Sequence, residues 1–271
     1  MSVDARWLMA YAASIDDTKR MHMDTTVSGG IVGHPLFVVC LEWPVLASCR
    51  LDDANVQVTG GSAVLHAGHD TIIHRLVRPG DSLATSLTIE GIEAKRPGVL
   101  VRYLLETVDA EGLPVATTRF DALALGAHHD LPDFAPTVDN LPAWVPPSEA
   151  SGFHEATFQV GAGSAHIYSE CARIFNPVHT DRAVARAAGL DHPILHGTAT
   201  LARAVSTVVD HVWEGRSETV TRVSGRFASP VTPPSVLMVR WSSCSTSAVA
   251  FQVVAPGDRV VVDQGLIMNR N

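Results

Sequence analysis

The chain is poor in several residue types, and each shortage argues against a class of protein. Aromatic residues make up 6% of its 271 residues and charged residues 18%, whereas hydrophobic residues reach 46%. The net charge is −8 and Lys and Arg form no dense cluster, which argues against nucleic-acid binding. No apolar run reaches the ~18 residues that a membrane-spanning helix needs. We therefore expect a globular chain, of one large or two modest domains, that binds neither nucleic acid nor membrane.

Cysteine is also scarce, and the four cysteines follow no recognisable pattern. Cys40, Cys49, Cys171 and Cys244 form neither a CxxC motif nor a dense framework. Residues 1–7 lack the basic start and apolar core of a secretory signal peptide. Both observations predict reduced thiols in a cytoplasmic protein.

A weak internal repeat predicts the organisation of the chain. Three pairs of segments match in the same order, namely residues 11–24 with 170–181, 33–36 with 191–194, and 77–83 with 231–237. In the first pair, His22 and Asp24 align with His179 and Asp181 at an offset of 157 residues. The other two pairs are offset by 158 and 154 residues. Three ordered matches with small drift indicate two related halves.

A proline-rich segment lies between the halves and predicts an extended linker. The stretch from His128 to Gly152 contains five prolines: Pro132, Pro136, Pro142, Pro146 and Pro147. Proline at such spacing disfavours helix and favours extended backbone. We expect a first half over residues 1–130, a linker over 131–152 and a second half over 153–271.

Each half is expected to contain a polar motif, one apolar helix and several strands. The second-half helix is predicted from Thr198 to about Val212, and Pro44 is expected to end or kink its first-half counterpart. Runs rich in Val, Ile and Thr predict strands over Ala63–His66, Asp70–Leu76, Leu83–Ile92, Gly98–Val108, Val115–Ala124, Thr219–Phe227, Val236–Ser242, Ala248–Val254 and Arg259–Leu266. Asp109 to Gly112 is typical of a hairpin turn.

The segment around His179 combines a fixed turn with a histidine. Asn176-Pro177 disfavours helix at Asn176, so His179 lies at a defined point just after a turn. Eighteen residues later Gly197 opens an apolar helical segment, and N–H groups at a helix start can hold a developing negative charge. A near-neutral histidine beside such donors suits proton transfer next to a carbonyl.

These residues resemble the signature of MaoC-like dehydratases, which include the (R)-specific enoyl-CoA hydratases. That signature runs Gly-Asp-x-Asn-Pro-aliphatic-His and then Pro-Ile-Leu-His-Gly. Asn176, His179 and Gly197 fit it, whereas Arg173 replaces the glycine and Ile174 replaces the aspartate. The resemblance implies an α+β tandem (double) hotdog fold, in which each half is a central helix wrapped by a curved antiparallel sheet.

The resemblance also implies roles for the site residues. His179 would act as general base and acid, Asn176 would support the geometry, and the Gly197 N–H would bind the thioester oxygen. His196 and Arg173 are further candidates for substrate binding. The residue types alone equally allow purely structural roles. Asn176 would then cap the turn and Gly197 would be a plain helix start. His196 would be a structural residue, and Arg173 would reach solvent.

Ile174 cannot position water or accept a proton, so we considered two other carboxylates. Asp17 and His22 keep the Asp-to-His spacing of the family in the first half, although Lys19 replaces the asparagine; we interpret this pair as a relic. Glu42 falls on the first-half helix, where some hotdog dehydratases carry an acid, and a solvated or capping role is the alternative.

The sequence predicts neither a metal nor a cofactor. His192 and His196 are four residues apart, but the glutamate of a zinc HExxH motif is missing and Pro193 intervenes. Gly161-Ala-Gly163 is not a complete dinucleotide fingerprint. A GxSxG elbow for a serine hydrolase is also missing.

The leading hypothesis is a hydro-lyase, that is, a hydratase or dehydratase acting on an enoyl or β-hydroxyacyl thioester of CoA or an acyl carrier protein. The missing aspartate keeps two alternatives open: a non-catalytic acyl-thioester-binding protein, and a thioesterase on the same fold. A double hotdog already contains the pairing that single hotdogs form as dimers, and a further homodimer remains possible.

Overall fold

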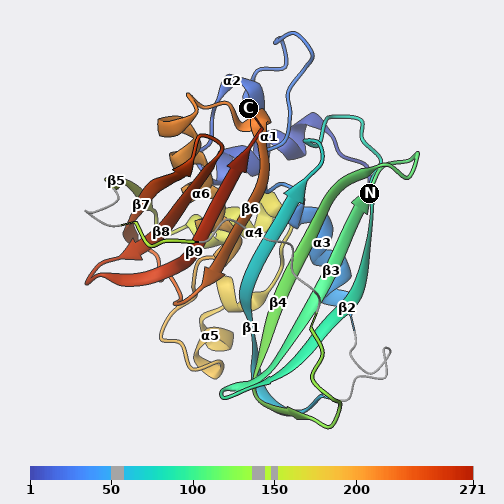
Figure 1. Ribbon diagram of the computed structural model, residues 1–271, viewed down its shortest axis with the longest axis vertical. Helices are drawn as coiled ribbons and strands as arrows, with labels where there is room; N and C mark the ends of the chain where they lie inside the picture. Colours follow the sequence, from blue (N-terminus) through green and yellow to red (C-terminus); the bar gives the residue numbers. More distant parts are fainter. Residues whose placement is uncertain (50–57, 136–143, 148–151, 271) are drawn as a thin grey trace.

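The computed structural model describes residues 1–49, 58–135, 144–147 and 152–270. One antiparallel sheet of nine strands runs through the molecule, and the main helices pack together on one of its faces (Figure 1). The strand order is β2-β3-β4-β1-β6-β9-β8-β7-β5. This arrangement is an α+β fold in which the two halves of the chain contribute the two ends of one sheet.

The first half contributes α1 (Ala5–Ser14), α2 (Arg20–Met23), α3 (Val39–Ser48), β1 (Val58–Ile73), β2 (Ala84–Lys95), β3 (Gly98–Val108) and β4 (Pro114–His129). The second half contributes β5 (His154–Val160), α4 (Ser164–Ala172), the 3-10 turn η3 (Pro177–His179), α5 (Arg182–Ala187), α6 (Gly197–Val212), η4 (Ser217–Thr219), β6 (Val220–Phe227), β7 (Ser235–Ser245), β8 (Ala248–Ala255) and β9 (Arg259–Asn269).

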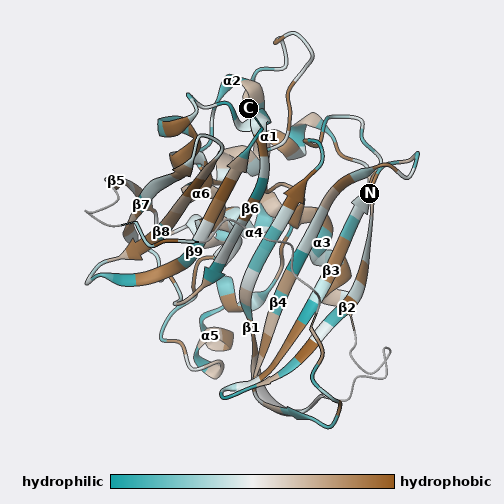
Figure 2. Ribbon diagram, in the orientation of Figure 1, coloured by the Kyte–Doolittle hydropathy of each residue, from teal (hydrophilic) through white to brown (hydrophobic). Residues whose placement is uncertain are grey.

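The helices form where capping and apolar spacing agree. The Asp4 carboxylate caps α1 by accepting a hydrogen bond from the Trp7 N–H at 2.7 Å. Trp7, Leu8 and Tyr11 recur at helical spacing and are buried. The longest helix, α6, is buried along most of its length, and β8 is a nearly continuous apolar strand (Figure 2). Together these elements build the core that holds the loops in place.

The halves meet both in the sheet and among the helices. Strand β1 pairs with β6 in antiparallel register from Gly68 opposite Arg226 to Ile72 opposite Arg222, which makes the sheet continuous. On the helical side α1 packs against α4, where the Tyr168 hydroxyl lies 3.5 Å from the Tyr11 hydroxyl. These tyrosines are 157 residues apart and mark the centre of the internal symmetry.

The structure confirms most predicted elements. The second-half helix begins at Gly197, and Asp109 to Gly112 turns between β3 and β4, with the Gly112 N–H donating to the Asp109 carbonyl. One prediction was wrong. The two strands expected over residues 63–76 are one strand, β1, with a bulge between His66 and Gly68. Pro44 was expected to end or kink its helix; it does not end the helix, because α3 continues past it to Ser48.

Helices α1, α2, α4 and α5 and strand β5 were not predicted. Strand β4 ends at His129 and β5 begins at His154; of the predicted linker, residues 136–143 and 148–151 lie outside the described residues. No helix among the described residues is long and apolar enough to cross a membrane.

The structure corrects one offset of the internal repeat. The Gly33 N–H donates to the Val77 carbonyl at 2.7 Å, and the Leu195 N–H donates to the Val231 carbonyl at 2.8 Å. Gly33 therefore corresponds to Leu195 and His34 to His196, at an offset of 162 rather than 158. The His-Pro dipeptide that both segments contain had produced a false match. The chain before the helix is longer in the second half than in the first, so equivalent residues are further apart in sequence.

Candidate active site

His179 lies at the end of η3, directly before α5, and is half-buried. Its Nδ1 lies 2.8 Å from the Ile194 carbonyl oxygen. A carbonyl only accepts hydrogen bonds, so the neutral ring carries its proton on Nδ1 and leaves Nε2 as the basic nitrogen. Burial lowers the pKa of His179, which favours this neutral, proton-accepting form.

Asn176 fixes the turn that presents His179. Its backbone is extended, and its side-chain oxygen accepts a hydrogen bond from the Val178 N–H at 3.3 Å. Pro177 then opens the 3-10 turn with its fixed φ. Asn176 therefore caps the turn, which is the structural role that its residue type allowed. By holding the turn, the cap supports the geometry of the site indirectly.

His196 packs directly on His179. The two rings stack with centroids 3.6 Å apart, and His196 Nε2 lies 3.3 Å from Ser169 Oγ and 3.4 Å from the Ile174 carbonyl. Burial, reinforced by the neighbouring His179, lowers the pKa of His196 to about 2. His196 is therefore a neutral, buried wall of the site, and it lies at the N-cap of α6.

Gly197 opens α6, whose first turn has no side-chain cap. Its N–H is therefore available to a ligand at the positive end of the helix dipole. A Cβ on Gly197 would lie 2.8 Å from the Phe227 ring, closer than side chains approach. Close packing against Phe227 explains the glycine without any catalytic role, and the same packing places the N–H beside His196.

An apolar residue, Ile174, occupies the position that carries the aspartate in the family signature. Ile174 is buried within the main core, with 6% of its surface exposed. Arg173, which replaces the glycine, adopts a left-handed backbone conformation and places its guanidinium 3.8 Å above the Trp7 ring. Arg173 is thus a stacking residue in this structure, and the described contacts do not bring it to His179.

In the first half, Asp17 lies within a buried polar cluster. Its carboxylate accepts hydrogen bonds from Lys19 Nζ at 2.8 Å and from Ser206 Oγ at 2.7 Å. The Nε2 atoms of His22 and His34 lie 3.8 and 3.9 Å from the same carboxylate. Burial alone would raise the pKa of Asp17, but His34, His22 and Lys19 outweigh it and lower the pKa to about 2.

The two halves hold their histidines identically. His22 Nδ1 lies 2.8 Å from the Val32 carbonyl, just as His179 Nδ1 lies 2.8 Å from that of Ile194. At the repeat offsets Asp17 corresponds to Ile174, Lys19 to Asn176 and Pro35 to Gly197. Pro35 has no N–H, so the first half has the acid but no glycine donor, whereas the second half has the donor but no acid.

The two candidate acids do not meet His179 in this structure. Asp17 faces α6 through Ser206 within its own cluster. Glu42 is buried on α3 and bonds to Thr118, and burial raises its pKa to about 7. None of the hydrogen bonds, ion pairs or ring contacts among the described residues links either carboxylate to His179.

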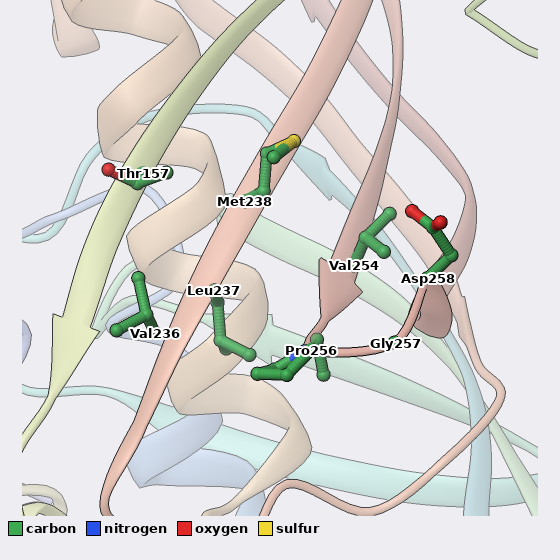
Figure 3. A pocket seen from close by; sticks show the side chains of 9 residues that line it. Thr157, Val236, Leu237, Met238, Val254, Pro256, Gly257 and Asp258 are labelled. Carbon is green, nitrogen blue, oxygen red and sulfur yellow. The ribbon is translucent and has the colours of Figure 1, made fainter.

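Other surface features lie away from His179. One shallow depression is formed by β5, β7 and the turn after β8, and its lining includes Thr157, Met238 and Asp258 (Figure 3). Another lies beside Lys19 and Asp210. The described residues include no group of three or more His, Cys, Asp or Glu that could hold a metal ion.

Ser169, Ser206 and His34 were not among the sequence candidates. His34 would have emerged from the correct repeat offset, because it then aligns with His196. Ser206 had no signal, since it contacts Asp17 across 189 residues of sequence.

Comparison with solved structures defines the fold class. The chain is similar to a MaoC-like dehydratase from Phytophthora capsici, with a TM-score of 0.85 and 22% identity, covering 99% of this chain and 92% of that one. A Mycobacterium tuberculosis protein described as having a double hotdog fold matches with a TM-score of 0.63 and 15% identity, covering 99% and 92% of the two chains. The protein is a double hotdog.

Sequence comparison then finds a family match for each half. Residues 171–258 match the MaoC like domain, and residues 1–118 match the FAS1-like, dehydratase domain region. The second half thus matches a MaoC-like domain, as the residues around His179 had indicated, and the first half matches a dehydratase region.

Two curated relatives match parts of the chain. The peroxisomal enoyl-CoA hydratase 2 of Arabidopsis thaliana is 39% identical over 64 residues, which are 24% of this chain and 21% of that protein. The 3-hydroxyacyl-thioester dehydratase Y of Mycobacterium tuberculosis is 36% identical over 98 residues, or 34% of each. The matches thus span about a fifth to a third of these relatives.

Proposed function

We propose that the protein is a hydro-lyase that adds water to an enoyl thioester, or removes it from a β-hydroxyacyl thioester, at His179. The observation that carries this proposal is the pairing of His179, whose Nδ1 is bound to the Ile194 carbonyl, with the uncapped start of α6 at Gly197. The names of the two curated relatives, a hydratase and a dehydratase of thioesters, support the same reaction class.

In the hydration direction, His179 Nε2 accepts a proton from water while the water oxygen bonds to C3 of the enoyl group. Electron density moves from the double bond toward the thioester oxygen, which the Gly197 N–H stabilises. The protonated imidazole then returns a proton to C2. The sum is addition of one water across C2=C3, and dehydration is the reverse sequence.

Ile174 affects this reaction, because the reacting water has one hydrogen-bond partner fewer than it would have beside the aspartate of the family signature. In the proposed site His179 alone accepts from the water, and the thioester must supply or recruit any second polar contact. We therefore expect slow turnover of plain enoyl thioesters and faster turnover of a substrate that carries its own polar group.

The test follows the absorbance of short and medium trans-2-enoyl-CoA in the presence of the wild type, His179→Ala and Ile174→Asp. We expect the wild type to turn over the thioester, His179→Ala to lose this activity and His22→Ala to retain it. His22 is the matched control, because it has the same backbone contact in the first half. Equal activity of the wild type and His179→Ala would overturn the assignment of the site.

The buried Ile174 specifically favours one second candidate, a non-catalytic acyl-thioester-binding protein. Calorimetry with a saturated acyl-CoA separates the two. Binding that survives His179→Ala, together with no turnover by wild type, would support the binding protein. Activity gained by Ile174→Asp would show an intact pocket that the natural sequence does not use for simple hydration. Release of free thiol would instead reveal a thioesterase.

A further inference from the structure

A row of polar side chains, all buried except the half-buried His66, crosses the inner face of the sheet where the two halves join. We call it the polar row; its members are Glu42 on α3, His66, His69 and Thr71 on β1, and Thr118 on β4. Strand β1 pairs with β4 on one side and with β6 on the other, so the row lies at the centre of the sheet. The hydration step proposed above uses none of these residues.

The members of the polar row form a continuous chain of contacts. Glu42 bonds to the Thr118 hydroxyl, which lies 2.9 Å from the Thr71 hydroxyl. The Thr71 hydroxyl in turn lies 2.9 Å from His69 Nε2. The His69 and His66 rings meet edge to face, with centroids 5.4 Å apart. The row therefore runs from the first-half helix to His66 without interruption.

The His66 end of the row reaches the proposed reaction centre through one aromatic ring. His66 stacks on Phe120 at 3.8 Å and contacts Phe227 edge to face at 4.6 Å. Phe227 packs against Gly197 so closely that a Cβ there would lie 2.8 Å from its ring. The polar row thus begins one side chain away from the N–H that would hold the thioester oxygen.

Three atoms of the polar row are buried without any hydrogen-bond partner: Glu42 Oε1, His66 Nε2 and His69 Nδ1. A buried polar atom left unpaired costs on the order of 1–3 kcal/mol, and three in one row are unusual in a native core. Because the His66 end of the row lies one aromatic ring away from Gly197, a ligand held at that N–H is the nearest source of the missing partners.

The charge state of the row selects the kind of ligand. Burial lowers the pKa of His66 well below its usual value and that of His69 to about 4, so both imidazoles are neutral near pH 7. Burial raises the pKa of Glu42 to about 7, so its carboxyl is substantially protonated there. Neutral donors and acceptors suit a hydroxyl or keto oxygen, whereas a carboxylate would be desolvated with no cation from the row to balance it.

We propose that the polar row recognises a neutral hydroxyl or keto oxygen on the acyl part of the substrate, beyond the carbons that react. This proposal rests on the proposed function for the position of the thioester at Gly197. It narrows the substrate class from acyl thioesters in general to acyl thioesters with an oxygenated chain.

The test compares trans-2-enoyl-CoA thioesters of one chain length, each bearing a single hydroxyl at a different carbon beyond the double bond, with the plain thioester. Turnover is measured as kcat/KM, and binding of the saturated analogues is measured by calorimetry. We expect one hydroxylated isomer to be preferred by about tenfold in either readout, the effect of roughly one hydrogen bond.

Two variants assign the preference to the polar row. His66→Phe keeps the ring that stacks on Phe120 but removes Nε2, and Thr118→Val removes the central hydroxyl. Both should reduce the preference, which is the ratio of the hydroxylated to the plain thioester, toward unity. Thr85→Val is the matched control, because it breaks a similar threonine pair with Thr107, 2.8 Å away between β2 and β3. Circular dichroism checks that each variant folds.

The outcomes separate the two proposals. A hydroxyl preference in binding without turnover of any thioester would support the polar row and contradict the hydratase proposal. Turnover without any preference, or a preference that both row variants leave unchanged, would overturn the polar row and leave the hydratase proposal standing.

Discussion

At the scale of single residues, the two halves differ in which groups of the signature they carry. The first half has Asp17 but, with Pro35, no N–H donor at the helix start; the second half has Gly197 but, with Ile174, no acid. Neither half holds the complete set of groups that the family signature contains. Activity at His179 would therefore require the substrate to supply part of what the protein lacks.

Glu42 provides a prediction about pH at this scale. Burial raises the pKa of folded Glu42 from 4.5 to about 7, although the bond from Thr118 opposes the shift. The folded protein therefore binds more protons than the unfolded chain between these values. The contribution of protonated Glu42 to the free energy of unfolding is complete below pH ~4.5 and is lost as the pH rises through ~7.

Glu42→Gln stays neutral at every pH and avoids this loss. We expect the free energy of unfolding of the variant to exceed that of the wild type by about 3 kcal/mol near pH 8 and to match it near pH 4. Urea unfolding at the two pH values measures the difference, with the exposed Glu106→Gln as control. A difference independent of pH would contradict the assigned protonation.

At the scale of elements, the short helix α5 keeps the end of the His179 segment in place. Its N-cap is Asp181, whose carboxylate accepts hydrogen bonds from the Ala183 and Val184 N–H groups at 2.7 and 3.2 Å. Asp181→Ala should cost about 1 kcal/mol of unfolding free energy. Thermal unfolding beside the exposed Asp191→Ala measures this, and equal loss in both variants would argue against capping.

Elements with a single clear pattern could be predicted from the sequence. The breaker-free run after Gly197 and the β-branched strands of the second half are examples, as is the Asp109 to Gly112 turn. Helix α4 escaped prediction because Ile167 faces solvent, with 53% of its surface exposed, and blurs the amphipathic pattern. The bulge that joins two predicted strands into β1 depends on pairing with β4, which is a tertiary property.

The candidate site was open to prediction only where it is local in sequence. The motif singled out His179, Asn176 and Gly197 as candidates, because a turn and a helix start are encoded by neighbouring residues. The contacts of Asp17 with Ser206 and of Gly197 with Phe227 join distant segments, and no spacing rule reports them. The polar row likewise assembles from two strands of the sheet, β1 and β4, and one helix, α3.

At the scale of the whole molecule, the seam between β1 and β6 carries a nearly buried ion pair. The Asp70 carboxylate accepts hydrogen bonds from Arg222 Nε at 2.8 Å and Nη2 at 2.6 Å. Asp70→Ala should reduce the free energy of unfolding by about 3 kcal/mol, because the largely buried Arg222 guanidinium loses its two hydrogen bonds to that carboxylate. The exposed Asp258→Ala, which removes a surface partner of Arg240, should cost less than about 1 kcal/mol.

Denaturant unfolding followed by tryptophan fluorescence and by circular dichroism tests this prediction. Because the sheet is continuous across the seam, we expect both probes to report one shared transition in the wild type. Two separate transitions, or equal effects of the two variants, would show that the halves unfold independently and that the seam contributes little.

The joining of both halves in one chain has an evolutionary consequence. In a dimer of identical hotdog subunits, every substitution appears twice, so a mutation that disables one site disables its twin. Here Ile174 and Pro35 each alter one half alone. Such a chain can keep one half for chemistry and adapt the other to a new ligand, a freedom that duplication followed by fusion gives and that a symmetric ancestor would not have.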